Sequence, residues 1–419
     1  MMRFSPQTYR KIFQEVLSPL DITINGDGPH DIQIHNPLFY QRVLSDCSVG
    51  LGESYMNGWW DVPQLDSFFA RLTKNKPLIP FTSTTAFYYV KNLLTTTSRI
   101  IKQSIINGQN KKHSHKVTEK HYDLGNEFYK AMLDPFMQYT CAYYKIDNDY
   151  LNQAQVNKLD LVCKKLHLPQ KVQPLEKVLE LGCGFGGFAN FATTNYNCEV
   201  VGYNISKEQV TFARQFNQDL PFIIREEDYR NAVIIEPRFS FDKVVSIGLC
   251  EHIGPKNYKT LMQTVDACLK TEGLFLLHTI GRNTSMLPGT ADRWTTKYIF
   301  PGAHVPSAAQ ITKSAEKLFR LEDVHNFGHD YDKTLMAWFT NFDKSWPTLK
   351  ENVGESIYQT MHHTCKEWPA FSDDKGERFY RMWKYYLQNC AGAFRSGSLN
   401  LFQFVFSKRN QSKKYISVR

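Results

Sequence analysis

Two titratable residues stand near the ends of consecutive strand candidates. Glu251 follows the apolar run 241–247, and His278 lies near the end of the run 274–280. The carboxyl ends of neighbouring parallel strands meet at one edge of a sheet, so both side chains are expected in one crevice. A carboxylate and an imidazole there can accept and donate protons at one reacting centre. The alternative is a structural Glu-His dipeptide held by backbone hydrogen bonds.

A glycine-rich turn lies earlier in the chain, between an apolar strand candidate and a helix. Its glycines, Gly182, Gly184, Gly186 and Gly187, let the backbone approach a ligand where a Cβ would collide. The spacing differs from the G-x-G-x-x-G of dinucleotide folds, although Gly187 also satisfies that looser pattern. Glu180, before the turn, would repel a pyrophosphate but could meet an ammonium group or order the loop. The turn therefore favours S-adenosylmethionine over NAD; the alternative is glycines that serve only chain reversal.

Amide and carboxylate side chains follow the next two strand candidates, where a nucleoside would lie. An acid usually binds the ribose at the end of the second strand, but the run 198–203 is followed by Asn204. Asn204 or Gln209 would have to replace the acid with amide hydrogen bonds. Asp228, after the third strand, is placed to accept from an adenine amino group, and a helix-capping Asp is the alternative.

Strand and helix patterns alternate around these residues, which predicts a doubly wound α/β sheet. The strand candidates are 177–181, 198–203, 221–225, 241–247 and 274–280, with a last strand at 401–406, and helices are expected at 152–166, from about 207, from about 258, at 334–346 and at 378–394. The segments 121–129 and 137–144 mix polar and aromatic residues, which suits a lid over a cofactor.

The length of 419 residues, of which 42% are hydrophobic, indicates two domains. The first hundred residues are expected to be largely helical, with apolar residues at helical spacing in 9–17 and 65–72. Aromatic residues gather between glycines in 51–60, which favours a small core over the alternative, a lipid-contacting surface. The polar, basic segment 106–120 is predicted to be a linker that is either simply solvated or helps to hold an anionic bilayer.

The composition restricts the compartment and the partners. The formal net charge of +9 suits nucleic acid or an anionic membrane and does not choose between them. No apolar run approaches the ~20 residues of a spanning helix, and the first residues lack the apolar core of a signal peptide, so a soluble cytoplasmic protein is expected. The nine cysteines show no C-x-x-C spacing, so neither a disulfide framework nor a metal site is predicted.

Ten segments carry a resemblance to a known family. They are LGESYMNGWW (51–60), HYDLGN (121–126), YTCAY (139–143), the glycine turn, EHIGPKNY (251–258), LHTIG (277–281), KYIFP (297–301), HNFG (325–328), YDKTLMAW (331–338) and CAGAFR (390–395). In order along nearly the whole chain, they resemble the bacterial cyclopropane-fatty-acyl-phospholipid synthases. Such collinearity is far more specific than any single motif.

The resemblance implies a two-domain enzyme whose catalytic domain, 121–419, has the class I methyltransferase (Rossmann-like) fold. The smaller, mainly helical N-terminal domain, 1–105, would engage phospholipid and aid dimerisation, with 106–120 as the linker. The family transfers the methyl of S-adenosylmethionine to a cis double bond of an unsaturated phospholipid acyl chain and closes a cyclopropane ring through a carbocation. A bound bicarbonate acts as the base. A cytoplasmic homodimer, peripherally associated with the inner face of the membrane bilayer, is therefore expected.

The resemblance also implies roles for individual residues. Cys141 and Ile280 would contact the bicarbonate through their backbone, Glu251 and His278 through their side chains, and Tyr331 through its hydroxyl. The residues expected to line the cofactor are Tyr139, Thr140, Gly182, Gly184, Asn204, Gln209 and Asp228. The chain departs from the family pattern at Asn204, where many relatives have Thr, and at 361–377, which looks like an inserted surface loop.

Three alternative functions differ in product or partner. A related lipid C-methyltransferase would leave a methyl-branched or hydroxylated chain instead of a ring. A non-catalytic lipid-binding relict would bind S-adenosylmethionine without turnover, but the intact glycines with Glu251, His278 and Tyr331 argue against it. A nucleic-acid amino-methyltransferase usually carries Asn/Asp-Pro-Pro-aromatic after the fourth strand. This chain has Leu-Cys-Glu-His at 249–252, so no nucleic-acid partner is expected.

Overall fold

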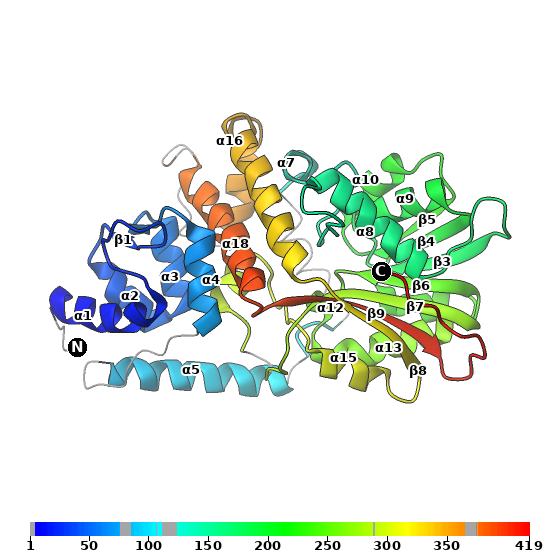
Figure 1. Ribbon diagram of the computed structural model, residues 1–419, viewed down its shortest axis with the longest axis horizontal. Coiled ribbons are helices and arrows are strands. Elements are labelled where there is room, and N and C mark those ends of the chain that lie inside the picture. Colours follow the sequence, from blue (N-terminus) through cyan, green and yellow to red (C-terminus); the bar gives the residue numbers. More distant parts are fainter. Residues whose placement is uncertain are drawn as a thin grey trace.

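A seven-stranded sheet in the order β5-β4-β3-β6-β7-β9-β8 forms the centre of the larger part of the molecule (Figure 1). The computed structural model describes residues 5–75, 85–105, 107–110, 124–287, 290–364, 374 and 376–419. The strands are β3 (Glu176–Leu181), β4 (Cys198–Asn204), β5 (Phe222–Glu226), β6 (Phe241–Ile247), β7 (Leu269–Gly281), β8 (Phe319–Asn326) and β9 (Asn400–Lys408). Strands β3 to β7 are parallel, whereas β9 is antiparallel to both β7 and β8.

The sheet confirms the predicted α/β fold class and the predicted strands. The order of the strands reverses at β3 and β6, since β4 and β5 extend the sheet on one side and β6 and β7 on the other. Ligands of such sheets bind outside the carboxyl ends of the strands at this switch point. The sequence does not predict β8, because Phe-Arg-Leu-Glu-Asp-Val-His-Asn is charged, lies at the sheet edge and has no continuous apolar run.

Helices cover both faces of the sheet (Figure 1). Helices α8 (Leu151–Lys165), α9 (Gly187–Asn195) and α10 (Lys207–Phe216) lie on one face, and α13 (Tyr258–Cys268) and α15 (Ala308–Ala315) lie on the other. Successive residues of β3 enter different cores: Val178 joins the core of Phe188, whereas Leu179 joins that of Leu261. A parallel sheet covered on both faces requires apolar residues at both kinds of position.

The N-terminal elements pack on the C-terminal helix α18 (Glu377–Arg395). They are α1 (Pro6–Leu17), η1 (Ser18–Leu20), β1 (Gln33–Ile34), α2 (Leu38–Asp46), α3 (Ser48–Met56), β2 (Trp60–Asp61), α4 (Leu65–Asn75) and α5 (Ala86–Ile105). The ring of Tyr385 in α18 lies 5.6 Å from that of Tyr55 and 5.0 Å from that of Phe69. Arg381 of the same helix pairs with Asp61 at 2.7 Å. The N-terminal helices therefore share a hydrophobic core with the C-terminal part of the chain.

This packing tests the prediction for the aromatic segment 51–60 but not the predicted domain boundaries. The aromatic segment 51–60 forms core, since Tyr55 and Trp60 are buried. The domain boundaries at 105 and 121 stay a prediction. Of the linker 106–120, only 107–110 lie within the described residues. There the carbonyl of Gln109 accepts a hydrogen bond from Arg230 Nη1 at 3.1 Å, so this short stretch lies against the sheet-containing part.

Helices α16 (His329–Thr364) and α18 confirm the two predicted C-terminal helices, and α16 is much longer than predicted. The remaining elements are α7 (Asn126–Met132), η2 (Tyr229–Asn231), α11 (Ala232–Ile235), α12 (Cys250–Ile253), η3 (Pro255–Asn257) and α14 (Arg293–Tyr298). The predicted surface loop 361–377 is wrong at its start, because Met361 is a buried residue of α16; 365–373 and 375 lie outside the described residues. No helix in the described ranges is long and apolar enough to cross a membrane.

Gly392 sets the distance between α18 and α4. A Cβ at this position would lie 2.6 Å from both the Ala70 nitrogen and the Asp66 carbonyl oxygen, which no rotamer change can move. We expect Gly392→Val to lower the free energy of unfolding by about 3 kcal/mol, the upper range for overpacking a close contact. Urea titration measures it, with Gly108→Val as the control, because a Cβ there meets open space. Equal effects of the two substitutions would contradict this account.

Candidate active site

A cavity of about 490 Å³ lies at the carboxyl ends of β3, β6 and β7, at the switch point of the sheet. Its polar lining includes Glu180 and Glu251, and Leu72 of α4 closes one part of it. The aromatic residues of its wall are Tyr139, Phe185, Phe300, Tyr331, Tyr386 and Phe394. A wall that combines several aromatic and aliphatic residues with a few placed polar groups is typical of a site for a largely apolar ligand.

A smaller cavity of about 140 Å³ adjoins the first, and Gly182, Gly184 and Gln209 line both. Asn204, at the end of β4, lines only the smaller one. Its Nδ2 donates to the Gly184 carbonyl at 3.0 Å and to Gln209 Oε1 at 2.9 Å. The two amides predicted to replace the ribose-binding acid are therefore held together at the glycine turn.

Asp228 also lines the smaller cavity, but its carboxylate is engaged within the chain. It accepts from the backbone N–H of Arg230 at 2.9 Å and from Arg230 Nη2 at 2.6 Å. The capping alternative for Asp228 is thus present in the structure. Contact with an adenine amino group stays a prediction, because a carboxylate has lone pairs beyond those used here.

Gly182 and Gly184 of the glycine turn lie at the edge shared by the two cavities. Gly182 and Gly184 have φ angles of +81° and +52°, which L-residues with side chains rarely adopt. A Cβ on Gly187 would lie 1.9 Å from the carbonyl oxygen of Phe136. The turn therefore needs glycine for conformation at Gly182, Gly184 and also Gly186, whose φ is +79°, and for close approach at Gly187.

Glu251 is buried in α12 and is held by β7. Its Oε1 accepts the backbone N–H of Ile280 at 2.6 Å, whereas its Oε2 is buried without a partner among the described residues. Burial raises the pKa of Glu251 to about 7, against the lowering effect of the Ile280 N–H. Thr279 Oγ1 donates to the Ile280 carbonyl at 3.0 Å. Both backbone groups of Ile280 are therefore already used, which limits its predicted role as an anion contact.

His278 is buried on β7, beside Gln403 of β9. Its Nδ1 is 3.3 Å from Gln403 Nε2, and its Nε2 is buried with no partner in the described part of the chain. Burial lowers the pKa of His278 well below its usual value, and the nearby cations Lys158 and Lys165 lower it further. The imidazole is therefore neutral at physiological pH, with one nitrogen left for another group.

Tyr331, in the first turn of α16, joins the same wall. Burial raises the pKa of its hydroxyl well above the usual value, and Cys141 and Glu251 raise it further, so these three groups lie within electrostatic reach. The thiol of Cys141 is buried, and its Sγ donates to the Ala142 carbonyl at 3.2 Å. Burial raises the pKa of this thiol far above its usual value, so it is neutral and a poor nucleophile.

We therefore expect Cys141→Ala to retain turnover within about three-fold of the unsubstituted protein, because the protonated thiol offers no nucleophile. Turnover and methyl-donor affinity measured on the same preparation test this. Cys163→Ala, at another buried cysteine in α8, is the matched control. Loss of turnover with donor affinity intact in Cys141→Ala alone would assign chemistry to the thiol.

Lys158 is a polar residue near the site that was not predicted from the sequence. It is fully buried in α8 and donates to Gln138 Oε1 and, at 2.9 Å, to Thr140 Oγ1. Burial lowers its pKa to about 8, while burial raises the pKa of Glu180 to about 8 against the opposing effect of Lys158. Lys158 thus orders the segment that carries Tyr139 and Thr140. The available signal was its place on the apolar face of the 152–166 helix, where a lysine is unusual.

Comparison with known proteins decides the family. Residues 109–367 match the family described as mycolic acid cyclopropane synthetase. The cyclopropane-fatty-acyl-phospholipid synthase of Escherichia coli (strain K12) is 43% identical over 400 residues, which cover 95% of this chain and 93% of that protein. The chain belongs to the mycolic acid cyclopropane synthetase family. The resemblance predicted from the motifs is confirmed, and so is the prediction that the chain is an enzyme.

Solved structures of the family have the same catalytic fold. The cyclopropane synthase MmaA2 from Mycobacterium tuberculosis is 25% identical, with a TM-score of 0.58 and coverage of 70% of this chain and 98% of that one. The cyclopropane synthase CmaA1, complexed with SAH and CTAB, is 28% identical, with a TM-score of 0.55 and the same coverage. These neighbours confirm the predicted class I methyltransferase fold.

The structure brings most of the predicted site residues of this family member together. Lining the larger cavity are Tyr139, Thr140, Gly182, Gly184, Gln209, Glu251, Ile280 and Tyr331, and lining the smaller one are Gly182, Gly184, Asn204, Gln209 and Asp228. Cys141 and His278 are not among the described residues that line either cavity. In the same described ranges, no group of three His, Cys, Asp or Glu residues could hold a metal, and the cysteines are unpaired.

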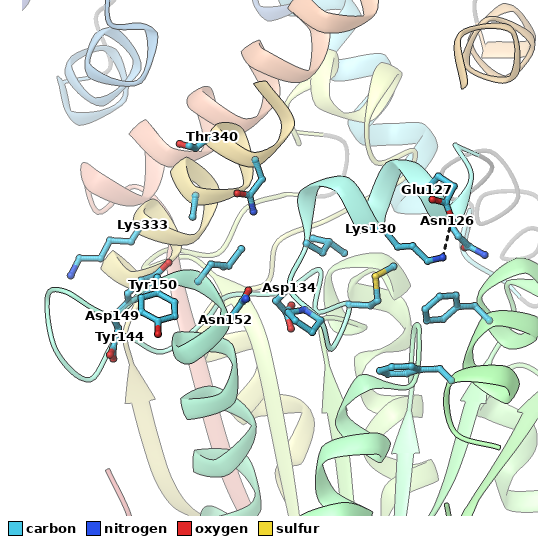
Figure 2. Close-up of a pocket in the computed structure, with 18 of the residues that line it drawn as sticks. Asn126, Glu127, Lys130, Asp134, Tyr144, Asp149, Tyr150, Asn152, Lys333 and Thr340 are labelled. Atoms are coloured by element: carbon cyan, nitrogen blue, oxygen red, sulfur yellow. Dashed lines mark hydrogen bonds and ion pairs between the residues drawn. The ribbon is translucent and has the colours of Figure 1, made fainter. Parts of the chain in front are cut away.

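A wider surface depression of about 1340 Å³ lies between α7, α8, α10 and α16 (Figure 2). Lys130 pairs there with Glu127 at 2.8 Å, and Lys333 pairs with Asp147 at 2.9 Å. Of the described residues, Met137 is the one that lines both this depression and the larger cavity. The two lysines of this depression are paired, and the predicted site residues line the other two cavities. We therefore assign the chemistry to the larger cavity at the switch point.

Proposed function

We propose that the chain transfers the methyl carbon of S-adenosylmethionine to the cis double bond of an unsaturated phospholipid acyl chain and closes a cyclopropane ring. The observation that carries this proposal is the carboxylate oxygen of Glu251, which has no partner among the described residues, in a cavity with several aromatic residues that adjoins a smaller cavity at the glycine turn. The names of the E. coli relative and of the CmaA1 complex support a lipid substrate and a SAM-type ligand.

The smaller cavity suits the nucleoside of the methyl donor, with the amides of Asn204 and Gln209 toward the ribose and Asp228 toward the adenine. Glu180 lies where the larger cavity meets the glycine turn, and its Oε2 is buried without a partner from the described residues. We assign it to the donor's ammonium group. Tyr139 and Thr140, ordered by Lys158, would close over the donor.

An alkene is a weak nucleophile, so the protein must hold it against the sulfonium and keep water out. Proximity of this kind supplies up to about 7–11 kcal/mol of the barrier. The aromatic wall around Tyr331 and Phe394, whose rings are 4.5 Å apart, excludes the water that would convert a carbocation to an alcohol. That dryness favours ring closure over a hydroxylated product.

Glu251 and Tyr331, which both line the larger cavity, suit a small bound anion such as bicarbonate, and His278, which does not line it, could join them only through its Nε2. Glu251 Oε2 and His278 Nε2 are buried and have no partner among the described residues, and the Tyr331 hydroxyl is protonated. Glu251 can accept a hydrogen bond, while Tyr331 and neutral His278 can donate. When bound, bicarbonate would supply the base for the proton lost from the transferred carbon. We also propose a homodimer that associates peripherally with the cytoplasmic face of the membrane, where the phospholipid lies.

Incubation of the purified chain with labelled S-adenosylmethionine and dioleoyl phospholipid vesicles tests the function. We expect label in the acyl chain, a mass gain of one CH2, and a product that ozone does not cleave, because a cyclopropane retains no double bond. An ozone-sensitive product of the same mass would indicate a methyl-branched alkene, and added oxygen would indicate hydroxylation. Donor binding without label transfer would make the chain a non-catalytic relict.

A further inference from the structure

Helix α5 carries its apolar face outward. The side chains of Phe87, Val90, Leu93, Leu94 and Ile101 are 54–67% exposed. With 3.6 residues per turn, these positions form one continuous stripe, which we call the α5 stripe. Figure 1 shows α5 as a separate helix along one edge of the molecule. A helix of a water-soluble surface normally has the opposite orientation, with its apolar face toward the core.

The opposite face of α5 contacts the protein through polar groups. Asn92 Nδ2 donates to the Leu44 carbonyl at 3.1 Å, and Lys91 pairs with Asp46 at 3.2 Å. The buried Tyr88 lies 3.3 Å from Tyr9, hydroxyl to hydroxyl. These contacts fix the rotation of the helix, so the α5 stripe cannot turn inward without losing them. These contacts therefore keep the apolar face of α5 directed outward.

We infer that the α5 stripe is the surface with which the protein docks on an anionic phospholipid bilayer. This inference rests on the proposed activity on membrane phospholipids. Residues 86–105 contain three cations, Lys91, Arg99 and Lys102, and no acidic residue. Lys102 is exposed, whereas Lys91 pairs with Asp46 and Arg99 lies near Asp292. An apolar face with an exposed cation and no acidic residue is what a helix lying in the interface of an anionic membrane presents. A second copy of the chain fits less well, because its own α5 would offer Lys102 no acidic partner.

The position of α5 connects the docked surface with the larger cavity. Burial lowers the pKa of Arg99, and Arg293 lowers it further while Asp292 raises it, so the helix passes close to Asp292. Asp292 and Met286 line the larger cavity, and the neighbouring Leu287 is 61% exposed. A bilayer under α5 would therefore lie beside the rim of the cavity, where an acyl chain could enter.

Vesicle binding of the full-length chain with Leu93 and Leu94 both changed to Glu tests the inference. Glutamate keeps the helix propensity, removes the apolar contact and adds a negative charge that an anionic bilayer repels. We expect at least about a ten-fold loss of partition onto equimolar dioleoyl phosphatidylglycerol/phosphatidylethanolamine vesicles, since apolar area drives such binding. Lys102→Gln should weaken binding by about five-fold, and only on anionic vesicles. Leu175→Glu, a 55% exposed leucine before β3, is the matched control and should bind unchanged.

Turnover separates this inference from the proposed function. The double variant should lose turnover on vesicles in parallel with binding, yet stay within two-fold of the unsubstituted chain on detergent-dispersed phospholipid. Equal vesicle binding by the double variant and the unsubstituted chain would overturn the inference while leaving the function intact. A change of molar mass in light scattering without a change in vesicle binding would assign the stripe to a second copy. A lowered melting temperature in the absence of lipid would show that the chain itself covers the stripe.

Discussion

Glu251→Ala is expected to cut turnover by about 10²- to 10³-fold while leaving the affinity for S-adenosylmethionine within two-fold. A loss of turnover of this size is typical when one preorganised group that stabilises charge in the transition state is removed. The donor affinity should be spared, because Glu251 is not among the residues assigned to the donor and does not line the smaller cavity, where the nucleoside is placed. Single-turnover kinetics and calorimetry on the same preparation measure the two quantities.

Two further observations separate chemistry from folding in this prediction. Glu251→Gln keeps an acceptor for the Ile280 N–H and removes only the charge, so it should lose turnover without losing stability. In the unsubstituted chain, a carboxyl with a pKa of about 7 is protonated below that pH and ionised above it. Turnover should therefore rise as the pH passes 7 and stay flat in the Gln variant. A large loss of donor affinity in Glu251→Ala would refute the assigned role.

Glu180→Gln is expected to have the converse effect, weakening S-adenosylmethionine binding by roughly 10- to 100-fold. A buried hydrogen bond between charged groups contributes about 1.5–3 kcal/mol, and 1.4 kcal/mol is a factor of ten. Glu176→Gln is the matched control, because Glu176 lies on the same strand at the end away from the glycine turn. Its donor affinity should not change.

Proton release provides a second readout for Glu180. Burial raises its pKa to about 8, so the free protein carries a proton there at pH 7. A cationic group bound beside the carboxyl lowers that pKa and expels the proton. The binding enthalpy should therefore depend on the ionisation heat of the buffer, and this dependence should vanish in Glu180→Gln. Donor binding with no buffer dependence in the unsubstituted chain would place the ammonium elsewhere.

Local sequence patterns were sufficient to predict the strands at the centre of the sheet. Each of β3, β4, β6 and the second half of β7 contains a mostly apolar run that ends at glycine or a polar turn, because a strand buried on both faces is mostly apolar. The edge strand β8 has no such pattern, since half of its side chains face solvent. The glycine turn was predictable for the same local reason: its conformation excludes side chains.

The site was predictable only in part. The ends of parallel strands meet at one edge, so Glu251 and the glycine turn could be placed together from their positions in the chain alone. His278 was expected in the crevice. Instead, β9 packs beside β7, and Gln403 Nε2 of β9 lies 3.3 Å from His278 Nδ1. Nothing local to His278 specifies β9, which lies more than a hundred residues later in the chain.

The sequence by itself determined the family, the sheet and the residue types at the switch point, because these depend on short apolar runs, glycine conformation and motif order. The tertiary structure decided how N-terminal helices join the core of α18, that Lys158 supports the segment over the cavity, and that α5 faces outward with its apolar side. A helical pattern specifies that one face is apolar. It cannot specify which face meets the protein, since that depends on partners such as Leu44 and Asp46, which lie far from α5 in the sequence.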